Sequence, residues 1–154
     1  MLEVEPIGYV HSAKATTEDD GWGGLEATII LTDAVGPDAL LGIEGFSHVE
    51  VLYVFHLVAP GAVERDARRP RGNPAWPRVG ILAQRGRTRP NRIGATIARV
   101  LGHAGRELRV QGLDAVDGTP VLDIKPVMRE FLPRESVRQP AWSEELMRHY
   151  WDEA

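Results

Sequence analysis

The feature that most constrains the fold is a long run of alternating side chains from His48 to Val58. Apolar residues take every second position along it, at Val49, Val51, Tyr53, Phe55 and Leu57. Because a strand turns successive side chains to opposite faces, this alternation predicts a β-strand with one face in a core. The opposite face is expected to carry His48 and His56 at its two ends.

Shorter segments repeat the strand pattern on both sides of this run. They cover residues 6–12, 26–31, 79–83, 107–111 and 121–125, with turn-forming residues between them. Residues 93–101 fit a helical stripe and strand alternation equally well. Five or six short strands without intervening long helices predict a mainly β fold, either a barrel or a strongly bent sheet. The same pattern disfavours a doubly wound nucleotide-binding fold.

A single helix is expected close to the C-terminus. Residues 140–143 open it, and Ser143 is the predicted N-cap. Its predicted apolar stripe consists of Leu146, Met147, Tyr150 and Trp151. With 154 residues and 43% hydrophobic residues, the chain has enough apolar material for one core, so a single domain over residues 1–154 is expected.

Composition excludes several classes of function. The sequence contains no cysteine, which rules out disulfides, thiolate metal ligands and a cysteine nucleophile. The longest apolar run, Val51 to Phe55, is far too short to span a bilayer, and residues 1–5 lack the start of a signal peptide. A cytoplasmic location is therefore expected. No two histidines form a close pair, so no metal site is predicted.

The basic residues are unevenly distributed. Nine arginines and a single acid, Asp66, lie between Arg65 and Arg92, which gives this segment a formal charge of +8 (nine minus one). The net charge is −4, so the rest of the chain carries −12. Arginine binds phosphate and carboxylate groups in a planar, bidentate geometry. The cluster therefore predicts an anion-binding surface, with a solvated loop as the alternative.

Two loops could supply the parts of a binding site. Residues 85–92 form an arginine loop after a predicted strand, able to grip a carboxylate or phosphates. Residues 113–120 supply Asp114, Asp117 and a turned backbone that could hold a cation or a ribose. A ligand with both needs is an amino-acid nucleoside. On pattern alone, a surface arginine loop beside an ordinary Asp-Gly hairpin explains the same residues.

Four blocks of this sequence resemble, in the same order, successive blocks of the TrmO-like (TsaA or YaeB-like) family of tRNA methyltransferases. They are Pro6 to Ser12, Gly42 to His48 with Val54 to His56, Val79 to Gly94 containing Arg89-Pro90-Asn91, and Leu113 to Pro126. The resemblance implies a β-barrel over about residues 4–127 that binds S-adenosyl-L-methionine without a Rossmann fold. It also implies a homodimer whose partners both build the site, and it favours a strand for residues 93–101. Residues from about 128 to 154 are expected to form an extension with the helix, in place of the additional C-terminal domain of longer members.

The resemblance also implies roles for individual residues. Carried over by position, the cofactor contacts are His56, Leu57, Arg85, Ala95, Gly112, Leu113, Asp114 and Ala115. Substrate contacts are expected from the basic segment, at Arg68, Arg69, Arg71, Arg87, Arg89 and Asn91. Attack of a nitrogen on the sulfonium methyl leaves a surplus proton, for which Asp114 and Asp117 are the candidate acceptors.

One segment departs from the family pattern. Where the tRNA enzymes carry basic residues, this chain has the acidic run Glu18-Asp19-Asp20 followed by Trp22. Three hypotheses therefore stand: N6-methylation of threonylcarbamoyladenosine in tRNA, methylation of a small metabolite, and non-catalytic binding of S-adenosylmethionine or RNA. Lys125 is expected to pair with an acidic neighbour, Asp123 or Glu130, rather than to bind substrate phosphate.

Overall fold

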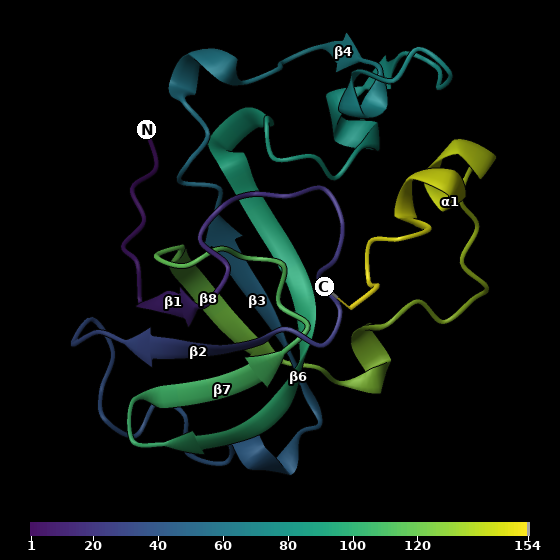
Figure 1. The fold of residues 1–154 in the computed structure, drawn as a ribbon. Helices are drawn as coiled ribbons and strands as arrows, with labels where there is room; N and C mark the ends of the chain where they lie inside the picture. The colour runs from purple at the N-terminus through teal and green to yellow at the C-terminus, as the bar shows by residue number, and fades with distance from the viewer. Residues whose placement is uncertain (154) are drawn as a thin grey trace.

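The computed structural model describes residues 1–153 and contains a closed barrel of six antiparallel strands (Figure 1). The barrel strands are β1 (Gly8–Ser12), β2 (Glu26–Leu31), β3 (His48–Val54), β6 (Ile93–Ala104), β7 (Glu107–Gln111) and β8 (Pro120–Pro126). They follow one another in the order β1-β2-β7-β6-β3-β8, and β8 pairs with β1 to close the barrel. The predicted mainly β fold is confirmed, in its barrel form.

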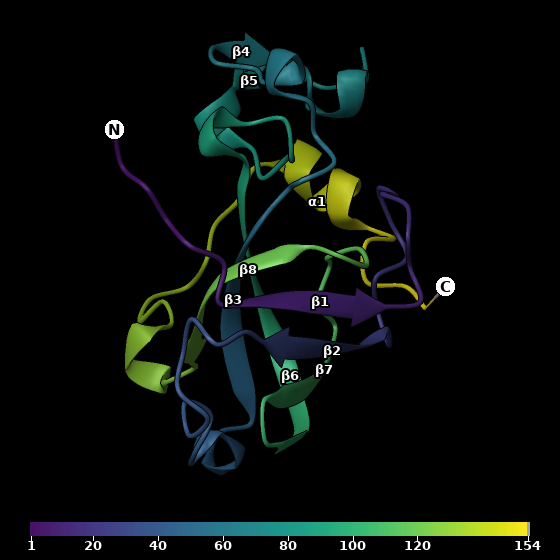
Figure 2. The same ribbon diagram turned by 90° about the vertical axis from the view of Figure 1, so that its left-hand side faces the viewer.

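The remaining elements lie outside the barrel. Short strands β4 (Ala67–Arg68) and β5 (Val79–Gly80) pair with each other, and the described residues contain one α-helix, α1 (Ala141–Met147). Single 3-10 turns occupy Ile43–Gly45, Pro60–Ala62, Pro70–Gly72, Ile81–Ala83, Pro90–Arg92 and Arg129–Phe131. Figures 1 and 2 show the β4–β5 region at one end of the barrel, with α1 beside it. Within residues 1–153, no helix combines the length and the apolar character needed to cross a membrane.

The barrel core comes from the inward-facing halves of the alternating strands. Val49, Val51 and Tyr53 of β3 are buried, as the alternation predicts. Residues of the neighbouring strands that complete this core include Val10, Ile29, Leu108, Val110 and Val121. Since closure leaves no strand edge unpaired, these short strands form a stable sheet without a covering layer of helices.

The segment that sequence pattern left ambiguous, residues 93–101, lies in the long strand β6. The first half of β6 pairs with β3 and the second half with β7. Gly94, Thr96 and Ala98 are buried at every second position, which is the period of a strand. The strand implied by the family resemblance is confirmed, and it joins the two sides of the barrel.

The strand predicted over residues 48–58 is too long. β3 ends at Val54, where the N–H of His56 donates to the Val54 carbonyl at 2.8 Å in a tight turn. Leu57 was expected to face the core and is instead 56% exposed, whereas Val58 is buried. The turn moves the inward-facing position from Leu57 to Val58. The alternation in the sequence therefore continues past the end of β3, where it no longer reports which side chains are buried. His56 therefore lies in the turn and not on the outer face of a strand.

Two further boundaries differ from expectation. Of the predicted strand 79–83, only the two residues of β5 form a ladder, and Ile81–Ala83 is a 3-10 turn. The helix α1 begins at Ala141 with Pro140 as its N-cap, so the prediction of Ser143 as N-cap is wrong. Ser143 lies inside the first turn, where its hydroxyl donates to the Pro140 carbonyl at 2.7 Å. The helix ends at Met147, so Tyr150 of the predicted stripe follows it in the chain.

Candidate functional site

Loop 112–119, which joins β7 to β8, carries four of the expected cofactor contacts. Gly112 opens the loop with φ 81°, a left-handed conformation that glycine adopts without steric penalty. Leu113 and Ala115 are buried and anchor the loop to the barrel core. Asp114 lies between these two anchors and is itself half-buried. The core therefore fixes the position of the Asp114 backbone.

Three hydroxyl groups meet on the carboxylate of Asp114. Its Oδ1 atom accepts a hydrogen bond from Tyr53 at 2.7 Å and another from Thr96. Its Oδ2 atom accepts one from Tyr150. Tyr53 comes from β3, Thr96 from β6 and Tyr150 from the segment after α1, so three distant parts of the chain converge on one side chain. Such charge-assisted bonds compensate a half-buried carboxylate for lost hydration.

Both tyrosines are held in their protonated form. Burial raises the pKa of Tyr53, and the negative charge of Asp114 raises it further. Burial also raises the pKa of Tyr150 and Asp114 adds to the rise, while the positive charges of Arg85 and Arg71 act in the opposite direction. The two hydroxyls therefore remain hydrogen-bond donors to Asp114 throughout the ordinary pH range.

Arg85 and Ala95, two further expected cofactor contacts, are in direct contact. The Nη2 group of Arg85 donates to the Ala95 carbonyl at 2.6 Å. Ala95 precedes Thr96 on β6, so this bond brings the exposed guanidinium next to the Asp114 cluster. A guanidinium has five N–H donors, and one bond to a carbonyl leaves others to bind a carboxylate or phosphate.

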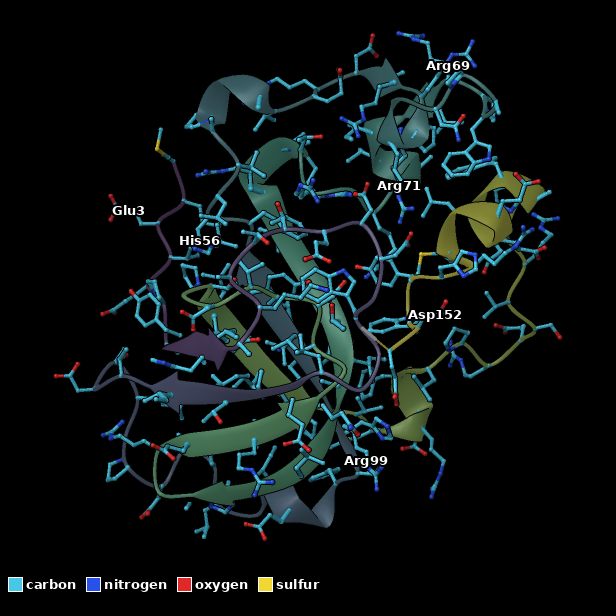
Figure 3. The ribbon with its side chains drawn as sticks, in the orientation of Figure 1. Glu3, His56, Arg69, Arg71, Arg99 and Asp152 are labelled. Atoms are coloured by element: carbon cyan, nitrogen blue, oxygen red, sulfur yellow. The ribbon has the colours of Figure 1, made fainter. Side chains whose placement is uncertain are left out.

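His56 and Leu57 follow β3 in the tight turn. A Cβ atom at Gly118 would lie 3.7 Å from Nε2 of His56, so the imidazole lies beside the far end of loop 112–119. Leu57 is mostly exposed. Figure 3 shows His56 on the left of the upper part of the molecule and Arg71 to its right, nearer to α1. The expected cofactor contacts thus border loop 112–119, with His56 at one end of the loop and the Arg85–Ala95 pair beside Asp114.

The other aspartates around β8 have structural partners. The Oδ1 atom of Asp117 accepts the N–H of Ser12 at 3.0 Å, and its own N–H donates to the Lys14 carbonyl at 2.8 Å. These bonds tie the loop to the end of β1. Asp123 lies 2.8 Å from the ammonium of Lys125, which confirms the expected pair. Among residues 1–153, no three histidine, aspartate or glutamate side chains gather as a metal ion would require.

The acidic run 18–20 lies against the basic segment. Arg71 donates to both carboxylate oxygens of Asp20, at 3.0 and 3.3 Å, and to the Asp19 carbonyl at 3.0 Å. Arg87 lies 3.8 Å from the Asp19 carboxylate. The acidic run departs from the family pattern, but nothing in the sequence predicted these contacts. Two of the expected substrate-binding arginines are therefore paired with acids of the same chain.

The other expected substrate contacts also hold the loops together. Arg69 donates to two carbonyls of its own loop, Arg89 donates to the Gln84 carbonyl at 2.6 Å, and Arg68 donates to the Thr88 hydroxyl at 3.1 Å. Asn91 is exposed, with φ 63°. A segment with little regular structure needs such partners for its carbonyls. Since carbonyl and hydroxyl acceptors are uncharged, these bonds leave the positive charge of the arginines in place.

Tyr150 is one of three residues of the site that sequence reasoning missed, together with Tyr53 and Thr96. It was assigned to the apolar stripe of a helix, whereas the structure directs its hydroxyl to Asp114. Its neighbours run alongside residues 21–23, whose N–H groups donate to the carbonyls of His149, Tyr150 and Asp152. No local sequence signal marks this contact, because loop 112–119 and Tyr150 belong to separate parts of the chain.

Comparison with known proteins identifies relatives for most of this structure. Residues 11–131 match the family model described as the tRNA-methyltransferase O N-terminal domain. Over 102 residues the chain is 38% identical to a human tRNA (adenine(37)-N6)-methyltransferase, an alignment that covers 66% of this chain and 23% of the human protein. Over 130 residues it is 38% identical to a probable S-adenosyl-L-methionine-binding protein of Methanothermobacter thermautotrophicus, covering 81% of this chain and 89% of that protein.

A solved structure shares the fold. The crystal structure of TrmO from Pseudomonas aeruginosa matches with a TM-score of 0.72 at 29% sequence identity, over 90% of this chain and 61% of that one. The chain thus spans less than a quarter of the human relative and less than two thirds of the solved relative. The range matched by the family model includes Asp114, Arg85 and Ala95, whereas Tyr150 lies outside it.

Proposed function

The chain belongs to the tRNA-methyltransferase O family through the domain at residues 11–131, and from this premise we propose that it is an S-adenosylmethionine-dependent methyltransferase. The observation that carries the proposal is the Asp114 hydroxyl cluster beside the Arg85–Ala95 pair, inside the matched range. Relatives named as S-adenosyl-L-methionine-binding proteins and as methyltransferases support both the cofactor and the reaction type.

The side chains around Asp114 fit the chemical groups of S-adenosylmethionine. A carboxylate such as Asp114 accepts hydrogen bonds from ribose hydroxyls or an ammonium group, and Arg85 suits the carboxylate of an amino acid. The negative charge of Asp114 and the carbonyls of loop 112–119 favour a cationic sulfonium. We therefore assign cofactor binding to loop 112–119, to Arg85 with Ala95, and to the turn at His56 and Leu57.

The chain contributes to the reaction mainly by positioning. S-adenosylmethionine, held by loop 112–119, Arg85 and Ala95, would supply a methyl group activated by the positive charge of its sulfonium, for transfer to an acceptor nitrogen. Residues that fix cofactor and acceptor in line account for most of the rate that such a site needs. The acceptor nitrogen also loses a proton, for which Asp114, inside the cluster, and Asp117, exposed at the end of β1, are the two candidates.

For the acceptor we propose an adenine N6 nitrogen in tRNA, specifically that of threonylcarbamoyladenosine. Two relatives, from human and Escherichia coli, are named tRNA (adenine(37)-N6)-methyltransferases. The arginine-rich segment supports a polyanionic substrate because five of its nine arginines donate to uncharged acceptors, namely Arg68, Arg69, Arg85, Arg89 and Arg92. We also propose that the chain forms one domain, acts in the cytoplasm and works as a homodimer.

A second candidate is methylation of a small metabolite. It is favoured by the acidic run 18–20, because the pairing of Arg71 and Arg87 with Asp20 and Asp19 reduces the positive surface available to RNA. The third candidate function is non-catalytic binding of S-adenosylmethionine or of RNA.

Calorimetric titration with S-adenosylmethionine and S-adenosylhomocysteine tests the proposal first. Micromolar binding of both is expected, followed by transfer of labelled methyl groups from S-adenosylmethionine to total tRNA. Binding of neither compound would contradict the methyltransferase function. Binding without transfer to tRNA, but with turnover in a small-molecule extract, would select the second candidate, and binding without any turnover would select the third.

Arg85→Ala is expected to weaken S-adenosylmethionine binding about tenfold, because it removes a charged hydrogen-bond donor from the site. The melting temperature should change little, since Arg85 is exposed. Calorimetry and thermal melting measure the two effects. Arg65→Ala is the matched control, an exposed arginine of the same segment outside the assigned site. Equal affinity of the Arg85 variant and the wild-type protein would remove Arg85 from the site.

Replacing Arg68, Arg69 and Arg71 together with alanine is expected to reduce tRNA affinity and its salt dependence. The slope of log affinity against log salt is negative, and each lost phosphate contact makes it shallower by roughly 0.7–0.9. Filter binding at several salt concentrations measures the slope, after thermal melting has verified the fold. Arg109→Ala, at an exposed position on β7, is the control. An unchanged slope in the triple variant would argue against this segment as the tRNA surface.

A further inference from the structure

Residues 148–153, which follow α1, run beside residues 21–23 in both views of the fold (Figures 1 and 2). Three backbone hydrogen bonds join the two segments, from Gly21 to His149 at 3.3 Å, from Trp22 to Tyr150 at 2.8 Å and from Gly23 to Asp152 at 3.2 Å. Gly23 also forms a parallel bridge with Glu153. This C-terminal segment is therefore docked from His149 to Glu153.

The loop that receives the C-terminal segment is itself well anchored. The Trp22 side chain is only 3% exposed, its indole N–H donates to the Glu18 carbonyl at 3.2 Å, and the Lys14 ammonium lies 4.2 Å from the ring centroid. At Gly23 the two backbones approach so closely that a Cβ atom there would lie 1.8 Å from the Trp151 carbonyl oxygen. Any side chain at position 23 must displace the C-terminal segment.

The docked segment directs the hydroxyl of Tyr150 to Oδ2 of Asp114, the carboxylate oxygen that Tyr53 and Thr96 do not bond. Tyr53 and Thr96, both from barrel strands, hold Oδ1 of Asp114. Oδ2 is held by Tyr150 alone among residues 1–153. Because barrel bonds reach only one oxygen, the orientation of the carboxylate plane depends on Tyr150.

We propose that residues 148–153 form one side of the S-adenosylmethionine site from within the same chain, and that Tyr150 is a positioning residue that orients the Asp114 carboxylate toward the cofactor. This inference rests on the proposed function. The proposal requires Tyr150 to keep its place when the cofactor binds, and the backbone bonds to residues 21–23 favour this by fixing the segment that carries the side chain. The site therefore extends beyond residues 11–131, the range that the family model matches.

Tyr150→Phe tests the proposal by removing one hydroxyl. S-adenosylmethionine affinity is expected to fall about tenfold because the Asp114 carboxylate is no longer held in its orientation, and the melting temperature should fall only modestly, since one hydrogen bond to a half-buried carboxylate is lost. Equilibrium dialysis and thermal melting measure the two quantities. Tyr9→Phe is the control, since Tyr9 is exposed on β1. A tyrosine that only stabilised the fold would lower the melting temperature and leave the affinity of the folded protein unchanged.

A double-mutant cycle asks whether Tyr150 acts through Asp114. In an Asp114→Asn background, Tyr150→Phe is expected to cause little further loss of affinity, because the charge that it orients is already gone. A full additional tenfold loss in that background would show that Tyr150 acts independently of Asp114, and would overturn the positioning role.

Gly23→Ala displaces the C-terminal segment without touching Tyr150 or Asp114. It is expected to weaken cofactor binding at least as much as Tyr150→Phe, while the barrel remains folded. Gly36→Ala is the control, because a Cβ atom at Gly36 has no neighbour within 4 Å. If the wild-type protein binds no S-adenosylmethionine, the proposed function itself fails. If it binds and either variant binds equally well, the proposed function stands and this inference is wrong.

Discussion

Replacing Asp114 with asparagine is expected to weaken S-adenosylmethionine binding about thirtyfold to a hundredfold. The substitution keeps the size of the side chain and removes its negative charge, and with it the charge-assisted hydrogen bonds that the proposed site offers to the cofactor. It also replaces the acceptor Oδ2 of the Tyr150 bond with either an amide N–H₂ or a weaker, uncharged oxygen. The lost charge and the weakened bond to Tyr150 both concern the carboxylate of Asp114. The loss of S-adenosylmethionine affinity should therefore exceed the loss caused by replacing any arginine of the proposed site.

Equilibrium dialysis of the Asp114→Asn protein measures the loss, with Asp33→Asn as a matched control at an exposed turn. Asp117→Asn separates the two proton-acceptor candidates, because Asp117 is tied to Ser12 outside the hydroxyl cluster. If Asp117 accepts the proton, its variant should bind cofactor normally and transfer methyl groups slowly. Wild-type affinity in the Asp114 variant would refute the assignment of this site.

Gly94→Ala is expected to destabilise the barrel by about 2–3 kcal/mol, a cost in the range of overpacked cores. A Cβ atom at Gly94 would lie 2.6 and 2.7 Å from ring carbons of Tyr53 and 2.8 Å from Phe55. The two rings already meet edge to face, with centroids 5.5 Å apart, so Tyr53 has little room to retreat. A displaced Tyr53 ring would also carry its hydroxyl away from Asp114, and cofactor affinity should fall with stability.

Urea unfolding and equilibrium dialysis measure these two consequences on the same preparation. Gly80→Ala provides the comparison, since open space surrounds a Cβ atom at that position. Unaltered stability of the Gly94 variant would mean that the barrel interior can expand, and the packing argument for Tyr53 would then be incorrect.

The fold was largely predictable because strand alternation is a local property. Val49, Val51 and Tyr53 alternate within one segment, and burial of one face follows directly from that order. The end of β3 was not predictable, since Leu57 continues the alternation after the turn at His56 has already reversed the chain. For residues 93–101, the sequence pattern fitted both a helix and a strand. The family resemblance favoured a strand, and the structure confirms it.

The site was less accessible to sequence reasoning, because its contacts join residues that are far apart. Family resemblance pointed to Asp114, Arg85 and Ala95, and the structure brings these together. The family resemblance gave no hint of the hydroxyl groups that bond Asp114. Two of them, from Tyr53 and Thr96, come together only because β3 and β6 pair in the barrel. The pairing of Arg71 with Asp20, 51 positions earlier, depends in the same way on tertiary structure.

The long separation between Trp22 and Tyr150, 128 positions (150 minus 22), has a consequence for the order of folding. The last barrel strand ends at Pro126, so the barrel closes without Tyr150, whose contact is added from outside the barrel strands. Contacts that close so long a loop carry a large entropic cost and form late. The barrel is therefore expected to fold first, through its own packing, and the contact of Tyr150 with Asp114 to form after it.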